Sequence, residues 1–117
     1  MRLLILGGTS FVGRTFAEAA GAAGHEVTLL NRGRTGSASG LPVIVADRDQ
    51  PDGLAALHGD DWSDATWDAV VDVSGLNAAR VLQSTRALRD RADHYLLIST
   101  VSVYDAAPGA VVTESSP

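Results

Sequence analysis

Residues 5–14 read ILGGTSFVGR, a glycine-rich turn between a short apolar run and an amphipathic stretch. The apolar run is typical of a buried strand, and residues 11–23 have the spacing of a helix that ends at Gly24. A helix that begins directly after such a turn directs unpaired N–H groups and the positive end of its dipole toward it. The stretch therefore predicts the first β-α unit of an α/β domain, with an anion bound at the turn.

The spacing of the glycines in this turn departs from the usual pattern. In a dinucleotide-binding turn, the first glycine permits the tight turn, the second lets a phosphate approach, and the third lets helix and strand pack closely. Ser10 stands at the second position, where its small side chain allows a close approach if its φ is negative. We expect a pyrophosphate to bind here, and the alternative is an ordinary glycine turn. The predicted binding residues are Gly7, Gly8, Thr9, Ser10, Phe11, Val12 and Gly13.

The rest of the chain alternates between short apolar runs and amphipathic stretches, which is typical of β-α-β units. Strands are predicted at 2–6, 26–30, 43–46, 69–73 and 94–99, and helices at 11–23, 51–58 and 77–91. Asp49 is the predicted N-cap of the second helix. The predicted buried face of the third helix consists of Ala78, Val81, Leu82, Thr85, Leu88 and Ala92. These elements predict one three-layer, doubly wound α/β domain over residues 1–117, with a parallel sheet of strand order 3-2-1-4-5.

The composition argues against several classes of partner and site. The 117 residues carry a formal net charge of −5, and the nine basic residues, all arginines, form no basic stripe. Nucleic acids and anionic membranes are therefore unfavoured partners. The chain has no cysteine, which excludes disulfides and thiolate sites, and no metal site is predicted. No apolar run is long enough to span a bilayer, so we expect a soluble, cytoplasmic protein.

Four segments in this order, ILGGTSFVGR, VTLLNRGRT, WDAVVDVSG and YLLISTVSVY, carry a resemblance to a known family. The chain resembles the N-terminal half of extended and atypical short-chain dehydrogenase/reductases, the NAD-dependent epimerase/dehydratase family. The spellings GGTSFVGR and NRGRT are most similar to the branch that includes the chloroplast stem-loop-binding proteins. The resemblance implies a Rossmann fold that binds a nicotinamide dinucleotide. It puts Asp47 and Arg48 beside the adenine, and Val73, Ser74 and Gly75 along the cofactor.

The turn after the second strand bears on which dinucleotide is bound. A carboxylate at this turn would accept hydrogen bonds from the ribose hydroxyls of NAD, whereas an arginine accommodates the 2′-phosphate of NADP. The sequence reads Asn31, Arg32, Gly33, Arg34, with two guanidinium groups and no acid. We therefore expect NADP to be preferred, with NAD as a second cofactor. The alternative is that Arg32 and Arg34 are solvated charges at a loop.

The resemblance also implies one half of a catalytic site. Thr100 matches the Ser or Thr, four residues before the tyrosine of a VY pair, that hydrogen-bonds the reacting oxygen of the substrate. Ser99, beside it, is assigned to the cofactor. The alternative is that Thr100 caps the end of the strand. The Tyr-x-x-x-Lys pair expected for proton transfer is absent. The residue four positions after Tyr95 is Ser99, the one four positions after Tyr104 is Pro108, and the chain has no lysine.

These observations predict the cofactor-binding part of a longer NAD(P)-dependent oxidoreductase, epimerase or dehydratase. Its substrate would be small and polar, such as a sugar nucleotide, and would bind through a missing C-terminal part. We expect residues 1–117 to bind a dinucleotide but to be inactive alone, and their uncovered last strand to favour a homo-oligomer. A non-enzymatic NADP sensor is the first alternative. An RNA-binding relative is the second, and the acidic charge weighs against it.

Overall fold

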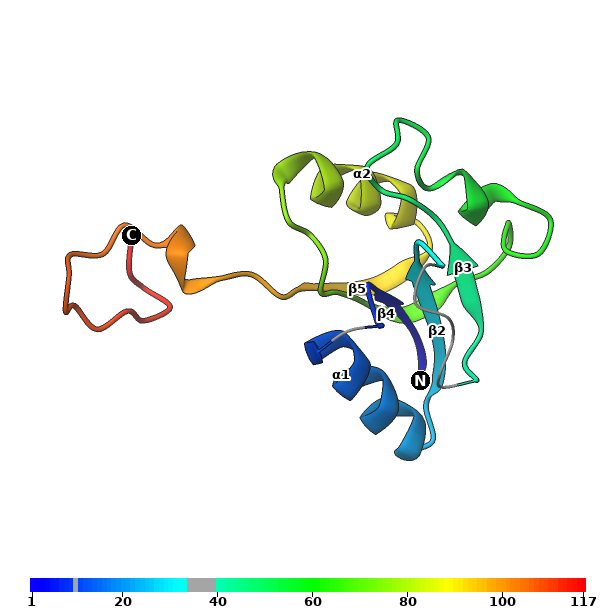
Figure 1. Ribbon diagram of the computed structural model, residues 1–117, viewed down its shortest axis with the longest axis horizontal. Helices are drawn as coiled ribbons and strands as arrows, with labels where there is room; N and C mark the ends of the chain where they lie inside the picture. Colours follow the sequence, from blue (N-terminus) through cyan, green and yellow to red (C-terminus); the bar gives the residue numbers. More distant parts are fainter. Residues whose placement is uncertain (10, 34–39) are drawn as a thin grey trace.

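The computed structural model describes residues 1–9, 11–33 and 40–117, which form a parallel sheet between two layers of helices (Figure 1). The sheet has the order β3-β2-β1-β4-β5, and all neighbouring strands run parallel. The strands are β1 (Arg2–Leu6), β2 (Glu26–Asn31), β3 (Val43–Val45), β4 (Trp67–Asp72) and β5 (Ala92–Leu97). The helices are α1 (Phe11–Ala22), the 3₁₀ helix η1 (Ala55–His58), α2 (Ala78–Leu88) and the 3₁₀ helix η2 (Val101–Val103). The predicted fold class and strand order are confirmed.

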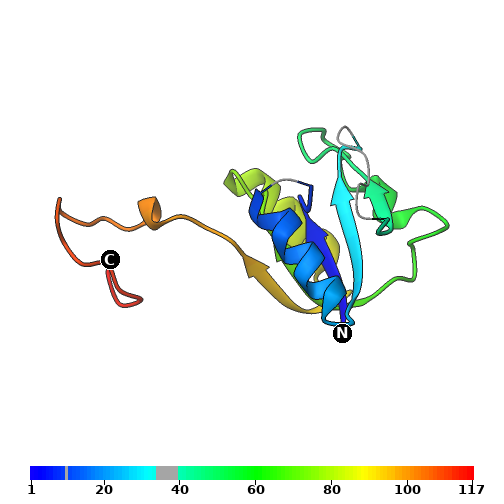
Figure 2. The ribbon, with the colours of Figure 1, turned by 60° about the horizontal axis from the view of Figure 1, so that its bottom comes forward.

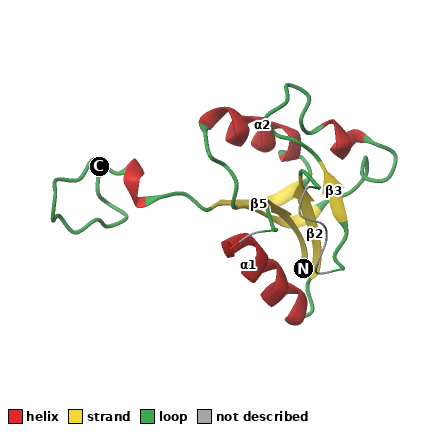
Figure 3. Cartoon of the chain, in the orientation of Figure 1, coloured by secondary structure: helices red, strands yellow, loops and turns green. Residues whose placement is uncertain are grey.

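The strands are apolar on both faces because a helical layer covers each face. In Figure 3, α1 lies below the sheet and α2 lies above it. Leu3 and Ile5 of β1 pack with Ala17 of α1, whereas Leu4 and Leu6 belong to a cluster on the opposite face. That second cluster also contains Leu30, Ile44, Leu57 of η1, Trp67 and Leu88 of α2. The sequence pattern of unbroken apolar runs thus reflects burial on two sides.

The last two strands begin earlier than predicted. Trp67 is the first residue of β4 and pairs with Ala92, the first residue of β5. The amide of Trp67 also donates to the carbonyl of Arg91, at 2.8 Å. This contact starts the β4–β5 pairing two residues before the predicted strands. The assignment of Ala92 to the preceding helix was therefore wrong.

The prediction of a helix over 51–58 was also wrong in part. Residues 51–54 form turns, and only η1 is helical. Leu54 is the N-cap of η1 and makes no side-chain capping bond, whereas Asp49 forms an ion pair with Arg80 of α2. A Cβ atom at Gly53 would lie 2.1 Å from the carbonyl oxygen of Asp47. The chain therefore folds back on itself too tightly here for a regular helix.

Helix α2 is shorter than predicted and presents a different face to the core. It ends at Leu88, and its buried residues are Ser84 and Leu88. Leu82, predicted to be buried, is 51% exposed. Arg80 of the same helix contacts the loop after β3: its Nε donates to Asp49, and its carbonyl oxygen accepts from Arg48.

The chain beyond β5 extends away from the sheet, as both Figure 1 and Figure 2 show. Leu96 of the edge strand β5 is 53% exposed, and Ile98, just after that strand, is 45% exposed. The predicted exposure of the last strand is therefore observed, whereas association with a second copy stays a prediction. None of the helices in the described part of the chain has the length and apolarity needed to cross a bilayer.

Arg91 fixes the loop between η1 and β4 at the amino ends of the strands. Its guanidinium donates to the carbonyl oxygens of Ala65 at 2.9 Å, Leu57 at 2.7 Å, and Trp62. The same group lies 5.2 Å from the centroid of the Trp67 ring, within reach of a cation–π interaction. One side chain thus satisfies three backbone acceptors of a loop that has little secondary structure of its own.

We expect Arg91→Ala to lower the free energy of unfolding by about 2 kcal/mol, because hydrogen bonds from a charged donor contribute more than neutral ones. Urea denaturation followed by circular dichroism measures the change. Arg89→Ala is the control, since Arg89 is exposed, and its effect should stay within about 0.5 kcal/mol. Equal midpoints for the two variants would contradict the prediction.

Candidate functional site

A cavity of about 400 Å³ opens at the carboxyl ends of the strands. Its wall comes from the β1–α1 turn, the ends of β2, β3 and β4, and the first turn of α2. The strand order reverses between β1 and β4, which is where doubly wound sheets bind ligands. Ten of the predicted site residues line this cavity: Gly7, Thr9, Phe11, Val12, Gly13, Arg32, Asp47, Arg48, Val73 and Ser74.

The β1–α1 turn has the backbone geometry that a tight anion-binding turn requires. Gly7 has a φ of 94°, which favours glycine, and its amide donates to the carbonyl of Leu30 at 2.9 Å. A Cβ atom at Gly13 would lie 2.6 Å from the carbonyl oxygen of Gly7 and 2.7 Å from Cγ2 of Val73. Helix α1 therefore packs against β1 and β4 as closely as a glycine allows. Ser10, predicted at the second position, lies outside the described residues.

Gly8 has a packing role in this turn and does not line the cavity. A Cβ atom at Gly8 would lie 2.5 Å from Cδ2 of Leu29, on the neighbouring strand β2. Phe11, the first residue of α1, is by contrast 89% exposed. Gly8 is thus packed into the protein, whereas Phe11 lies at its surface.

The end of β2 presents one described arginine to the cavity. Arg32 is exposed and lines the mouth, whereas Arg34 lies outside the described residues. Asn31 does not line the cavity, and its Oδ1 accepts a hydrogen bond from the amide of Gly33 at 2.7 Å. The side chain of Asn31 thus shapes the turn that carries Arg32.

Below the cavity, Asp72 at the end of β4 collects four hydrogen bonds while its side chain is fully buried. The Nη1 and Nη2 atoms of Arg48 donate to its two carboxylate oxygens at 2.8 and 2.7 Å. The hydroxyl of Tyr95 donates to Oδ2 at 2.6 Å, and the amide of Ser74 donates to Oδ1 at 3.0 Å. We call Arg48, Asp72, Ser74 and Tyr95 the Asp72 network.

The Asp72 network shifts the proton equilibria of two of its members. Burial alone would raise the pKa of Asp72, but the hydrogen bonds from Arg48, Tyr95 and the Ser74 amide outweigh burial and lower it. Burial and the carboxylate of Asp72 raise the pKa of Tyr95. Asp72 is therefore a carboxylate and Tyr95 a neutral phenol at neutral pH, and Tyr95 is unsuited to proton transfer.

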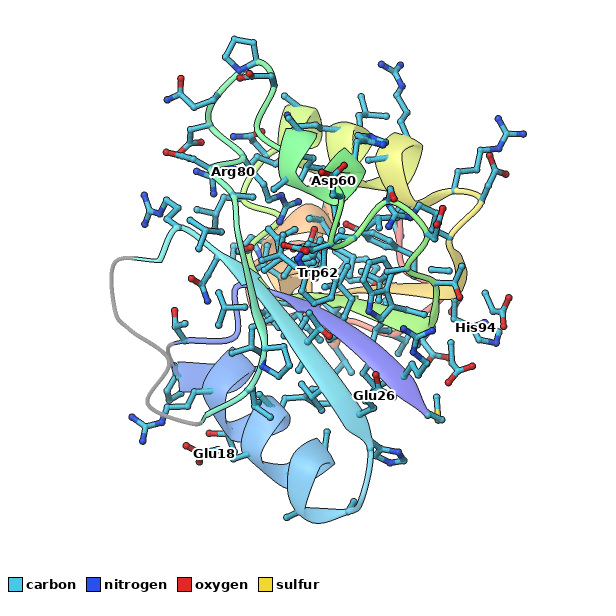
Figure 4. All side chains as sticks on the ribbon, turned by 90° about the vertical axis from the view of Figure 1, so that its right-hand side faces the viewer. Glu18, Glu26, Asp60, Trp62, Arg80 and His94 are labelled. Atoms are coloured by element: carbon cyan, nitrogen blue, oxygen red, sulfur yellow. The ribbon has the colours of Figure 1, made fainter. Side chains whose placement is uncertain are left out.

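Arg80 of α2 joins the outer rim of the cavity to the loop after β3. Its Nε donates to Oδ1 of Asp49 at 2.8 Å, and Nη2 contacts the same oxygen. Figure 4 shows Arg80 beside this loop. Asn77 caps α2, because its Oδ1 accepts from the amide of Arg80 at 3.0 Å. The sequence interpretation missed Arg80, Asp72 and Tyr95, although an acid that ends the apolar run WDAVVD indicated a buried partner.

Three further predicted site residues lie outside the cavity lining. Gly75 packs inside the protein, where a Cβ atom would lie 2.7 Å from Cδ1 of Leu97. Ser99 and Thr100 follow β5 and are exposed. Thr100 is the N-cap of η2, and its Oγ1 accepts from the amide of Ser102 at 3.3 Å. Thr100 therefore bonds backbone, as the alternative interpretation expected, but at the start of η2 and not at the end of the strand. A contact of Thr100 with a substrate stays a prediction.

The sequence matches a known protein family, and the fold matches solved structures. The model of the NAD dependent epimerase/dehydratase family matches residues 3–117. A search of curated proteins found no match. Among solved structures, UDP-glucose 4-epimerase of Thermus thermophilus in complex with NAD has a TM-score of 0.77 at 21% identity. That match covers 100% of this chain and 44% of the epimerase.

Two further solved structures are similar. WbmG of Bordetella bronchiseptica, in complex with NAD and UDP, has a TM-score of 0.74 at 22% identity, over 100% of this chain and 43% of WbmG. A short chain dehydrogenase family protein of Francisella tularensis subsp. tularensis has a TM-score of 0.75 at 16% identity, over 92% of this chain and 54% of that protein. The chain thus spans about half the length of these relatives, and identities this low establish a common fold alone.

Proposed function

The chain belongs to the NAD-dependent epimerase/dehydratase family, and we propose that its cavity binds a nicotinamide dinucleotide. The observation that carries this proposal is the close packing of Gly13 against Gly7 and Val73. This packing brings the N-terminus of α1 to the cavity wall, where its free N–H groups favour a pyrophosphate. The bound dinucleotide would supply hydride transfer, and the residues of this chain would bind and orient it.

The cavity lining fits the parts of a dinucleotide. The first turn of α1 would hold the pyrophosphate through the amides of Val12 and Gly13. Asp47, at the end of β3, would accept a hydrogen bond from the amino group of adenine. Val73 and Ser74 would border the cofactor at the end of β4. Most of the residues that the sequence resemblance assigned to the cofactor are thus found around one cavity.

We further propose that NADP is preferred over NAD. Arg32 lies at the mouth of the cavity, directly after β2, and the sequence has no acid at this turn. A guanidinium there can bind the 2′-phosphate through charge-assisted hydrogen bonds. Arg34 would add to the same positive charge.

Titration calorimetry with NADPH and NADH tests both proposals. The wild-type protein should bind NADPH more tightly, and Arg32→Ala should weaken NADPH roughly tenfold or more, since a charge-assisted hydrogen bond contributes about 1.5–3 kcal/mol. NADH binding should stay within about twofold, because NADH lacks the 2′-phosphate. Arg89→Ala, exposed and outside the cavity lining, is the matched control. Equal weakening of both dinucleotides by Arg32→Ala would contradict the preference.

The activity proposed for the whole protein is that of an oxidoreductase, epimerase or dehydratase acting on a small polar substrate, such as a sugar nucleotide. The hydroxyl of Tyr95 donates a hydrogen bond to Asp72, and the chain has no lysine, so we expect residues 1–117 alone to turn over no substrate. We also propose that the protein does not bind nucleic acid, because its net charge of −5 disfavours contacts with phosphates. We also propose a cytoplasmic location and a homo-oligomer.

A further inference from the structure

We propose that Arg48 is a positioning residue for the cofactor cavity: it anchors the segment of residues 47–53 to β4 and thereby holds Asp47 in the cavity wall. The inference rests on the proposed function, because it concerns how that cavity is shaped. The resemblance in sequence puts Arg48 beside the adenine, as a contact residue. Its hydrogen bonds in the structure support a different role.

The guanidinium of Arg48 has no accessible N–H group left for a ligand. Nη1 donates to Asp72 and to Oγ of Ser74, at 2.8 and 3.0 Å. Nη2 donates to Asp72 and to the carbonyl oxygen of Arg80, at 2.7 and 3.1 Å. These four bonds use all four Nη hydrogens. The remaining donor, Nε, is inaccessible and has no partner within the described residues. A ligand could reach this guanidinium only by breaking the Asp72 network.

The 47–53 segment depends on such anchors because it has little regular structure. It contains two tight turns, with hydrogen bonds from Gln50 N to Asp47 O and from Gly53 N to Gln50 O, both at 3.0 Å. Arg48 is buried, whereas its neighbours Asp47 and Asp49 are half-buried and exposed, and both line the cavity. The buried side chain of Arg48 thus holds its two neighbours, Asp47 and Asp49, in the cavity wall.

A gain in stability is not sufficient to explain why the Arg48–Asp72 ion pair is buried. A buried ion pair loses much of its Coulomb energy to desolvation, and apolar replacements are often no less stable. The pair Arg48–Asp72, with side chains 6% and 0% exposed, instead selects one conformation of the segment. A wall already held in its binding conformation does not have to be ordered when the ligand binds, and this raises affinity.

The test replaces Arg48 with lysine, which keeps the buried charge but cannot form the bidentate pair or reach all four acceptors. Calorimetry should give roughly tenfold weaker binding of NADPH and NADH alike, equivalent to about 1.4 kcal/mol. Arg32→Ala, in contrast, should discriminate between the two dinucleotides. Arg91→Lys is the matched control: it also removes contacts of a partly buried arginine, at the amino ends of the strands, and should leave both affinities unchanged.

A double-mutant cycle separates positioning from general destabilisation. In an Asp47→Ala background, Arg48→Lys should change the affinity less than about twofold, because residues that act through one another are not additive. Hydrogen exchange of the amides of Gln50 and Gly53 should be faster in Arg48→Lys without any ligand. If Arg48→Lys does not fold, the double variant Arg48→Met/Asp72→Asn, which leaves no buried charge unpaired, serves the same measurements.

Three results would overturn the inference: unchanged affinities in Arg48→Lys, the same loss with or without Asp47, or unchanged exchange of the two amides. Failure of the wild-type protein to bind either dinucleotide would instead overturn the proposed function. The exchange rates, which need no ligand, would then still decide whether Arg48 holds the segment. The two failures are therefore distinguishable.

Discussion

Replacing Asp72 with asparagine is expected to lower the free energy of unfolding by about 3–5 kcal/mol, because it leaves the Arg48 guanidinium buried without a counter-ion. The amide also cannot accept all four hydrogen bonds that the carboxylate receives from Arg48, Tyr95 and Ser74. Domains of this size have a total stability of about 5–15 kcal/mol. The variant should therefore unfold at a much lower urea concentration than the wild-type protein.

A control on the same strand separates the network from the loss of a negative charge. Asp68 of β4 is exposed and accepts a hydrogen bond from the amide of Arg2. Asp68→Asn should cost less than about 1 kcal/mol, since an exposed group is solvated in both states. A loss under about 1 kcal/mol in Asp72→Asn would show that the buried pair contributes little to the free energy of unfolding. The proposal that Arg48 anchors residues 47–53 through Asp72 would then be contradicted.

The pH dependence of stability has the same origin. The pKa of Asp72 is lowered in the folded protein, so the native state binds fewer protons than the unfolded state at acidic pH. The stabilisation by Asp72 is thus fully present above its unfolded pKa of about 3.9 and is lost as the pH falls through the lower folded value. Urea midpoints measured between neutral and acidic pH should fall more steeply in the wild-type protein than in Asp72→Asn.

The parts of the fold that the sequence predicted depend on local pattern. The β1–α1 turn could be located because its glycines, its strand and its helix are consecutive. The strand order was expected because alternating β and α segments predict the doubly wound topology. Most of the cavity lining was also predicted, in part because residues that follow parallel strands gather at one edge of the sheet, and in part because the family resemblance implied Asp47, Arg48, Val73 and Ser74. These inferences needed no knowledge of side-chain partners.

The Asp72 network could not be predicted in this way, because its members come from separate elements. Asp72 meets Arg48 from 24 residues earlier and Tyr95 from 23 residues later. The same limit explains the errors at η1 and α2. Asp49, expected to cap the helix predicted over 51–58, instead pairs with Arg80 of α2, 31 residues later, and helical periodicity contains no information about such a contact.

The second large effect is expected for Gly13→Ala. The added Cβ atom would lie 2.6 Å from the carbonyl oxygen of Gly7 and 2.7 Å from Cγ2 of Val73, closer than such atoms approach. Because the first contact is with backbone, α1 must move away from β1, which costs about 1–3 kcal/mol. The same movement withdraws the helix N-terminus from the pyrophosphate. We expect calorimetry to give about hundredfold weaker binding of both dinucleotides, equivalent to about 2.8 kcal/mol.

Gly21→Ala, in the same helix, is the matched control. No atom lies within 4 Å of a Cβ at Gly21, and alanine is the better helix former by about 1 kcal/mol. This variant should therefore be more stable than the wild-type protein and bind both dinucleotides with unchanged affinity. The same chemical change at two positions of α1 would then have opposite effects on stability, and only one of them would affect binding. Wild-type affinity in Gly13→Ala would mean that the pyrophosphate does not depend on the position of α1, and the proposed cofactor site would be wrong.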